Sequence, residues 1–340
     1  MITKRPILVA VGGDSGTGKT TLVAGLYRIF GSERITNICL DDYHKLDRAA
    51  RKQARVTALN PRANDLDLMV DHLNRLRRGE TIVKPTYDHS TGGFGPAETV
   101  VPRDIVVIRG LFPLFTAELN AAFDVRIWLD PQEELKWSWK VKRDCAQRGY
   151  SVPEVIRQLM DRRDDQLTFI APQQRNADLI VRFQAPAGYF LPGTSVDHDD
   201  AHLDVRIDLH ERLSRLDLDD VLAAGSNVPK PAIRLRHGTV NTASDGGRFS
   251  TLEIDGTISP RLARDLDERI WAHMDTHRHL RPSEIGDYLD GTTPRHSEPL
   301  ALTQLIVAYQ VARAAIERGN PLAGQPRLRE HLIASGAGRA

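Results

Sequence analysis

The segment 11–21, VGGDSGTGKTT, decides the fold of this chain. Residues 13–20 match the pattern G-x-x-x-x-G-K-[ST] in full. The apolar run PILVAV (6–11) precedes this match, and TTLVAGLYRIF (20–30) follows it with apolar residues at helical spacing. An apolar run, then glycines, then a 3.6-residue period predict a strand, a glycine-rich loop and a helix in that order.

Each position of this loop suits a grip on phosphate. Glycines let backbone N–H groups turn inward, and the helix that follows presents its positive end. The lysine reaches the outer phosphates, and the hydroxyl after it can bind Mg²⁺. A purely structural turn is the alternative, and the strand-loop-helix setting argues against it. We therefore predict ATP or GTP binding with Mg²⁺ through Gly13, Asp14, Ser15, Gly16, Thr17, Gly18, Lys19, Thr20 and Thr21.

Composition narrows the class of protein. The 340 residues are 41% apolar and 27% charged, with a formal net charge of +1, which is typical of a globular protein and not of one that tracks a nucleic-acid backbone. Two cysteines, Cys39 and Cys145, lack metal-ligand spacing. No apolar run reaches the roughly 18 residues of a membrane span. We predict a cytoplasmic protein without nucleic-acid or membrane partners.

Further short apolar runs predict an α/β fold. They lie at 35–40, 105–111, 125–129 and 177–183, separated by helical or loop segments. Strands that alternate with helices favour a mainly parallel sheet with helices on both faces. One such helix is expected at 65–79, with an apolar face made by Leu66, Met69, Val70, Leu73 and Leu76.

The pattern changes in the C-terminal third of the chain. Residues 202–210, 231–240 and 249–256 alternate apolar and polar positions, which predicts antiparallel strands with one face in water. Helical patterns follow at 260–274 and 298–319. We predict a P-loop NTPase fold over residues 1–195, an antiparallel-strand and helix extension over 196–325, and a flexible tail over 326–340.

The segment ICLDDYHKLDR (38–48) suggests where a phosphate acceptor would bind. It places Asp41 and Asp42 at the carboxyl end of the second strand, where open α/β sheets bind ligands. A kinase that acts on an alcohol needs a carboxylate to deprotonate the hydroxyl and cations if the acceptor carries phosphate. Asp41 with His44 and Arg48 could supply both, and a charged surface loop is the alternative.

Five segments together resemble the phosphoribulokinase family: GDSGTGKTT, ITNICLDDYHKLDR (35–48), TALNPRANDLDLM (57–69), KPTYDHSTG (84–92) and KVKRDCAQRGY (140–150). Their order and spacing are similar over residues 7–185. The resemblance implies ATP- and Mg²⁺-dependent phosphorylation of the C1 hydroxyl of the sugar phosphate D-ribulose 5-phosphate. The tail after residue 200 resembles, more weakly, the dimeric cyanobacterial, plant and archaeal class, which implies a homodimer.

The resemblance also assigns roles to residues of the P-loop, of a substrate-binding insertion at about 41–104 and of a lid at about 136–176. Asp41 matches the catalytic base, and Arg143, Asp144 and Arg148 match an essential lid signature. With Lys19, these form the predicted catalytic set. The predicted acceptor-binding residues are His44, Arg48, Arg62, Tyr87, His89 and Lys140, and the predicted metal ligands are Thr20 and Asp42.

The strand IVVIRGLFPLF (105–115) departs from the family pattern, which resembles V-V-I-E-G-L-H-P-L. Arg109 stands where an acid is expected, and Phe112 stands where the family has histidine. Three readings stay open at this point. Asp42 or Asp130 could replace the acid, the chain could be a nucleotide-binding relative with impaired catalysis, or the acceptor could be a nucleoside, as in uridine kinases.

The resemblance further implies that a redox switch is absent. Light-regulated relatives place a cysteine in the P-loop, where this chain has Thr17, and pair it with the cysteine that matches Cys39. We predict that Cys39 is a half-buried strand residue and that Cys145 is an isolated thiol on the lid helix.

Overall fold

A computed structural model describes residues 5–185, 202–213, 232–239, 248–274 and 285–319. Its centre is an eight-stranded sheet in the order β2-β5-β1-β6-β7-β8-β10-β9. The first five strands in this order are parallel, and β8, β10 and β9 continue the sheet antiparallel. In chain order the strands are β1 Ile7–Gly12, β2 Ile35–Cys39, β5 Ile105–Gly110, β6 Val125–Leu129, β7 Leu179–Gln184, β8 Asp204–His210, β9 Ile233–Thr239 and β10 Arg248–Ile254. The predicted mainly parallel α/β fold with an antiparallel extension is confirmed.

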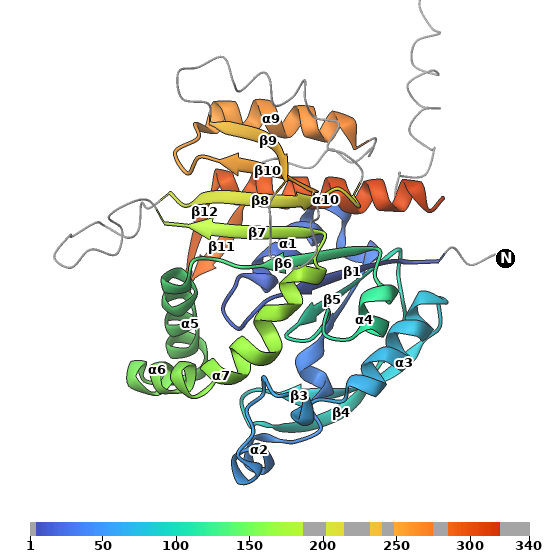
Figure 1. Ribbon diagram of the computed structural model, residues 1–340, viewed down its shortest axis with the longest axis vertical. Helices are drawn as coiled ribbons and strands as arrows, with labels where there is room; N and C mark the ends of the chain where they lie inside the picture. The colour runs from blue at the N-terminus through green and yellow to red at the C-terminus, as the bar shows by residue number, and fades with distance from the viewer. Residues whose placement is uncertain (1–4, 186–201, 214–231, 240–247, 275–284, 320–340) are drawn as a thin grey trace, which may run out of the picture.

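Helices cover both faces of this sheet (Figure 1). The face with α1 (Lys19–Phe30), α9 (Pro260–His273) and α10 (Glu298–Glu317) buries one set of strand side chains, including Val9 and Val107. The opposite face packs on α3 (Leu66–Arg77) and α4 (Ala117–Ala122) and buries the alternate set. Strands buried on both sides explain why β1 and β5 read as nearly continuous apolar runs.

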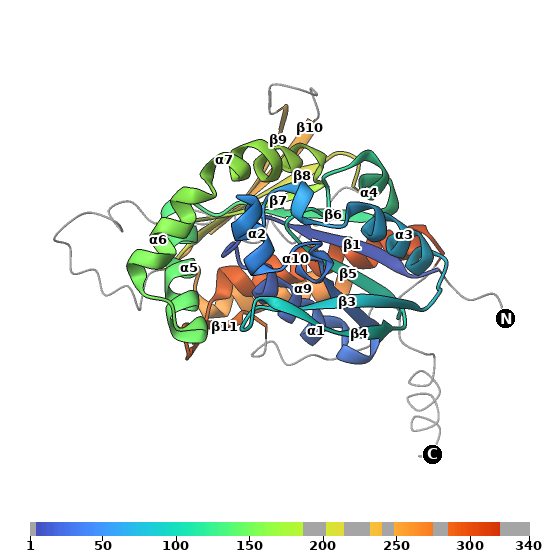
Figure 2. The same cartoon turned by 90° about the horizontal axis from the view of Figure 1, so that it is seen from below.

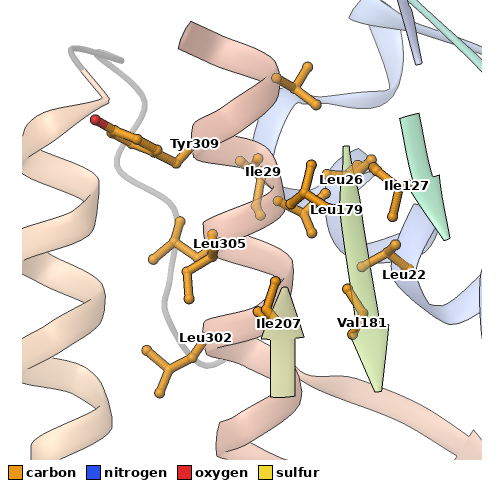
Figure 3. Close-up of a cluster of buried hydrophobic side chains, with 14 of the residues drawn as sticks. Leu22, Leu26, Ile29, Ile127, Leu179, Val181, Ile207, Leu302, Leu305 and Tyr309 are labelled. Atoms are coloured by element: carbon orange, nitrogen blue, oxygen red, sulfur yellow. The ribbon is translucent and has the colours of Figure 1, made fainter. Parts of the chain in front are cut away.

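Helix α10 lies inside the larger of the two apolar cores. By length and composition this helix could cross a membrane, but 83% of its most apolar 18-residue stretch is buried inside the protein. Figure 3 shows Leu302, Leu305 and Tyr309 of this helix in one cluster with Leu22 and Leu26 of α1. The helix is therefore a core element of the fold, and it joins the C-terminal extension to the P-loop helix.

The insertion between β2 and β5 holds more regular structure than the sequence predicted. Besides α3, it contains the 3₁₀ turns η2 (Leu40–Tyr43) and η3 (Pro61–Ala63), the helix α2 (Arg48–Ala54), and the antiparallel pair β3 (Ile82–Asp88) and β4 (Gly93–Val100). A third 3₁₀ turn, η1 (Ser32–Arg34), precedes β2. The β3–β4 pair and α2 lie together at the bottom of Figure 1, away from the C-terminal strands.

The predicted lid is helical. It consists of α5 (Glu133–Arg148), α6 (Val152–Asp161), α7 (Arg163–Asp165), the π-turn η4 (Gln166–Ile170) and the 3₁₀ segment η5 (Ala171–Asn176). Ser151 and Glu154 form a capping box that starts α6.

A short hairpin precedes α10. It consists of β11 (Asp287–Asp290) and β12 (Thr293–His296), which the sequence did not indicate. The predicted tail, 326–340, and the C-terminal end of the predicted extension lie outside the described residues.

Candidate active site

The P-loop connects β1 to α1 in the predicted strand-loop-helix arrangement. Gly18 precedes α1 with a φ of 89°, in the left-handed region that glycine adopts without strain. Gly16 has a φ of 84°, and a Cβ atom there would lie 3.0 Å from Lys140 Cβ of the lid helix. Gly16 therefore has no space for a larger side chain, and the loop leads into the start of a helix, as a phosphate cradle requires.

Lys19 spans this loop. Its Nζ donates to the carbonyl oxygens of Gly13 at 2.8 Å and of Asp14 at 2.5 Å. Burial lowers the pKa of Lys19 to about 8, although the nearby carboxylates of Asp41 and Asp14 act to raise it. A phosphate in the loop would offer this partly desolvated ammonium a stronger acceptor than two carbonyls. The hydroxyl-bearing Thr20 is exposed in the first turn of α1.

Asp41 lies directly after β2, close enough to Lys19 for each to shift the pKa of the other. Its Oδ2 is 3.3 Å from His89 Nε2 of the insertion. Burial alone would raise the pKa of Asp41, but the hydrogen bond and charge of His89, with the charges of His44 and Lys19, lower it on balance. The structure thus brings together the predicted base, the P-loop lysine and two predicted acceptor-binding histidines, with the base ionised.

Asp42 faces the other way. Its Oδ2 accepts from Lys84 Nζ at 2.7 Å, and its Oδ1 accepts from the Tyr87 N–H at 3.0 Å. Lys84, whose side chain is 5% exposed, also contacts Glu98 at 2.9 Å. These contacts anchor β3 to the end of β2, so they favour a structural role for Asp42 over the predicted metal-ligand role.

Arg109 is the penultimate residue of β5, which lies between β1 and β2, and it is in register with Val11 and Cys39. Its Nε is buried, with no hydrogen-bond partner among the described residues. Asp130, the other candidate for the missing acid, bonds to Arg182 and Gln174, each at 3.3 Å. The contacts of Asp130 therefore do not direct it to the P-loop.

Phe112, the second departure from the family pattern, is a core residue. It is 1% exposed and packs edge-on against Phe115 with ring centroids 5.4 Å apart. Its side chain thus contributes to packing below the site and not to polar contacts within it. Across the described residues, no group of three or more His, Cys, Asp or Glu side chains could by itself hold a metal ion.

The acceptor side is a ring of aromatic and basic side chains. Tyr87 packs edge-on against His44 and His89, with ring centroids 4.8 Å and 5.2 Å away. His44, which is 6% exposed, is oriented by a 2.8 Å bond between its Nδ1 and Asn64 Oδ1. Arg48 Nη2 donates to the His89 carbonyl at 2.5 Å. Most of the predicted acceptor residues therefore meet beside Asp41.

Arg51 belongs to this ring and was missed from the sequence. Its Nη2 donates to the Tyr87 hydroxyl at 2.6 Å, and its guanidinium lies 5.2 Å from the centre of that ring. One signal could have revealed it, because Arg51 follows Arg48 by three residues and so shares its face of a helix. Arg62 is exposed in η3 and lies at the rim of the insertion.

Asp144 organises the lid cations. Its side chain is fully buried, and it bonds to Lys140 Nζ, to Arg143 at 2.8 Å and to Arg148 at 3.4 Å. Burial would raise the pKa of Asp144, but these cations, Lys140 first, hold it below its usual range. Burial lowers the pKa of Lys140 to about 8, which the bond to Asp144 only partly offsets.

The lid touches the P-loop directly. Arg143 Nη2 lies 3.3 Å from Ser15 Oγ, and Lys136 Nζ lies 3.1 Å from Asp14 Oδ2. Asp14, Ser15 and Lys136 line a small pocket together with Arg162, and burial lowers the pKa of Arg162. Lys136 and Arg162 were not predicted as site residues. The pocket therefore lies between P-loop residues and cations of the lid, and such cations suit a bound polyphosphate.

The cysteines are both free. Burial, followed by the charge of Asp41, raises the pKa of Cys39 to about 12, so this thiol resists ionisation and reaction. Thr17 is 2% exposed, and its hydroxyl donates to the Asp14 carbonyl at 2.9 Å. Thr17 therefore acts as a structural part of the P-loop.

Comparison with known proteins places this arrangement in a family. The sequence profile of the "Phosphoribulokinase / Uridine kinase family" matches residues 8–186. The phosphoribulokinase of Synechocystis sp. is 37% identical over 279 residues, which cover 78% of this chain and 80% of that protein. The uridine kinase of Brevibacillus brevis is 32% identical over 180 residues, which cover 52% of this chain and 84% of the relative.

Plant relatives match a smaller share of both chains. The chloroplastic phosphoribulokinase of Triticum aestivum is 39% identical over 52% of this chain and 48% of its own length. A solved structure of phosphoribulokinase from Rhodobacter spheroides has a TM-score of 0.56 at 17% identity, covering 80% of this chain and 96% of that one, and so shares the fold. The chain therefore belongs to the phosphoribulokinase/uridine kinase family, and it is a small-molecule kinase.

Proposed function

We propose that this protein transfers the γ-phosphoryl group of ATP to D-ribulose 5-phosphate, giving ribulose 1,5-bisphosphate. One observation carries the proposal: Asp41 lies near the P-loop lysine and also near His44 and His89 of the insertion. A carboxylate at that point can meet a hydroxyl and a γ-phosphate together. The Synechocystis and wheat relatives are phosphoribulokinases, which supports the choice of acceptor.

The insertion suits an acceptor that already carries a phosphate. Arg48 and Arg51 both lie on α2, where Arg48 contacts His89 and Arg51 contacts Tyr87. Guanidinium groups bind phosphate oxygens through two parallel hydrogen bonds. In this proposal they hold the sugar's phosphate, and His44 and Tyr87 hold its hydroxyl groups.

The P-loop residues fit ATP with Mg²⁺. The backbone amides of the glycine-rich loop before α1 and Lys19 would bind the phosphates, and the Thr20 hydroxyl would bind the ion. Bound Mg²⁺ would neutralise the negative charge of the nucleotide's phosphates. Arg109 stands where the family pattern has an acid, so Thr20 and the nucleotide's own oxygens are the proposed ligands.

The side chains then divide the chemistry. Asp41, ionised and oriented by His89, accepts the proton of the attacking hydroxyl. Lys140, Arg143 and Arg148 stabilise the charge that spreads over the transferred group, because fixed cations act strongly in a site without water. Asp144 contacts these cations and positions them.

The experiment is an ADP-release assay with ATP and Mg²⁺ and with ribulose 5-phosphate, uridine, cytidine or no acceptor, checked by product mass. We expect turnover with ribulose 5-phosphate alone. Asp41→Asn should lower kcat about a hundredfold or more while binding of a non-hydrolysable ATP analogue persists. The matched control is Asp104→Asn, at an exposed aspartate at the amino end of β5.

Two alternatives have their own outcomes. Turnover on a nucleoside alone would show a uridine kinase-like acceptor choice. A silent wild type that gains turnover in Arg109→Glu would show a nucleotide-binding relative disabled by the arginine at this position. Full turnover of Asp41→Asn would refute the base assignment.

The homodimer and the cytoplasmic location predicted from the sequence are further proposals. The homodimer can be tested by measuring the mass of the protein in solution.

A further inference from the structure

The lid helix α5 contacts the C-terminal hairpin on the side that does not face the P-loop. Lys142 Nζ bonds to both carboxylate oxygens of Asp290, at 3.0 Å and 2.8 Å. Asp290 ends β11, and Figures 1 and 2 both place β11 beside α5. Lys142 takes no part in the cation cluster around Asp144, so its only described partner lies outside the lid.

The same hairpin is attached to the P-loop helix. Arg28 Nη1 of α1 donates to the Asp287 carbonyl at 3.0 Å. Gln304 of α10 is fully buried; its Oε1 accepts from the Gly286 N–H at 2.9 Å, and its Nε2 donates to the Thr21 carbonyl at 3.0 Å. The base of the hairpin is therefore fixed relative to the first turn of α1, next to the phosphate-binding residues.

We propose that the β11–β12 hairpin braces the lid over the P-loop, with Lys142 and Asp290 as positioning residues for the bound nucleotide. The lid contacts the P-loop through Arg143 and Lys136 on one side, and the hairpin holds it on the other. Breaking the brace shifts the lid towards an open arrangement. The inference rests on the proposed function only in that the lid closes on ATP.

The expected effect is modest because the pair is partly in water. The side chains of Lys142 and Asp290 are 42% and 23% exposed. Pairs of this kind change an equilibrium by about two- to fivefold, and salt weakens them. Since the lid closes over the phosphates, the same factor should appear in lid opening and in the KM for ATP, with kcat changed less.

The test compares Lys142→Ala, Asp290→Ala, the double alanine variant and the charge swap Lys142→Asp/Asp290→Lys. Hydrogen exchange of the α5 amides is measured without nucleotide, and binding of a non-hydrolysable ATP analogue is measured separately. We expect both alanine variants to speed exchange and to weaken binding about two- to fivefold. The double variant should add nothing further, and the swap should restore both readouts.

Arg78→Ala is the matched control, because it removes another exposed two-bond ion pair, with Glu80 at 2.5 Å and 3.2 Å. Unchanged exchange in α5, additive losses in the double variant, or a swap as impaired as the single variants would each overturn the proposal. Neither readout requires ribulose 5-phosphate. If the proposed acceptor is wrong, only the turnover assay will contradict it. If the proposed brace is wrong, hydrogen exchange and analogue binding will contradict it.

Discussion

Replacing Asp144 by Asn tests the lid chemistry most directly. Asparagine keeps the size of the side chain and removes its charge, which sits in the interior between Lys140, Arg143 and Arg148. The two arginines are about a third exposed and can turn to water, but the Lys140 side chain is only 1% exposed. The variant therefore leaves one buried ammonium without its carboxylate.

The size of the effect follows from that burial. Leaving one partner of a buried pair uncompensated costs about 3–5 kcal/mol. Each pKa unit corresponds to about 1.4 kcal/mol, so Lys140 can relieve this cost by lowering its pKa by about two units or more. Its pKa in the wild type is about 8, so in Asp144→Asn it should fall to about 6 or below. A lysine is charged below its pKa, hence Lys140 is largely charged at pH 7 in the wild type and largely neutral in the variant.

The assay is kcat/KM for ATP between pH 6 and 9. At pH 7.5 we expect Asp144→Asn to be about a hundredfold or more slower, the usual loss when a fixed stabilising group is removed from a transition state. The fall in kcat/KM at high pH that results from loss of the Lys140 proton should occur about two pH units lower in this variant. Lys19, whose pKa is also about 8, should contribute the same fall in both proteins.

Two comparisons make the result decisive. Lys140→Met should cost little further in the Asp144→Asn background, because the ammonium is already neutral there. Asp161→Asn, at an exposed lid position, should behave as the wild type. A variant with kcat/KM within twofold of the wild type and an unmoved alkaline limb would refute the idea that Asp144 keeps Lys140 charged.

Three further outcomes are expected. Arg51→Ala should raise the KM for ribulose 5-phosphate about tenfold or more with little change in the KM for ATP, because a charge-assisted hydrogen bond contributes about 1.5–3 kcal/mol; equal changes in both KM values would contradict this. Iodoacetamide at pH 8 should label Cys145 and not Cys39, as measured by mass spectrometry of the digested protein, because burial raises the pKa of the Cys39 thiol. Labelling of Cys39 would contradict this. Burial and the charge of Glu298 raise the pKa of Asp267 to about 7, so its folded form favours the proton and stability falls as pH rises from about 4 through 7. Asp267→Asn should therefore raise the free energy of unfolding by up to about 4 kcal/mol at pH 8 and leave it unchanged at pH 4, measured by urea denaturation.

The elements predicted well from the sequence are those whose side chains are buried on a fixed period. β1, β5 and β6 are runs of apolar residues because helices cover both faces of the sheet, and α3 has the expected apolar stripe. The family resemblance rested on polar motifs, and the comparisons confirmed it.

The β3–β4 pair could not be predicted in this way. Residues 93–98 of β4 are exposed or half-buried, and they include two glycines and a proline, so they show neither burial nor a strand composition. Lys84 of β3 contacts Glu98, its partner on β4, and also Asp42, which is distant in sequence. Asp42 was predicted as a metal ligand, and the sequence could not indicate its hydrogen bond with Lys84, which lies 42 residues away.

The buried α10 has a consequence for how the protein is made. The core that α10 completes also includes β1 and α1, so the first and last described elements of the chain share one interior. A ribosome releases the P-loop helix long before α10 exists, and until then the apolar side of α1 lacks its cover. Truncation before residue 298 should thus yield an aggregation-prone chain instead of a smaller working kinase, although the family match ends at residue 186.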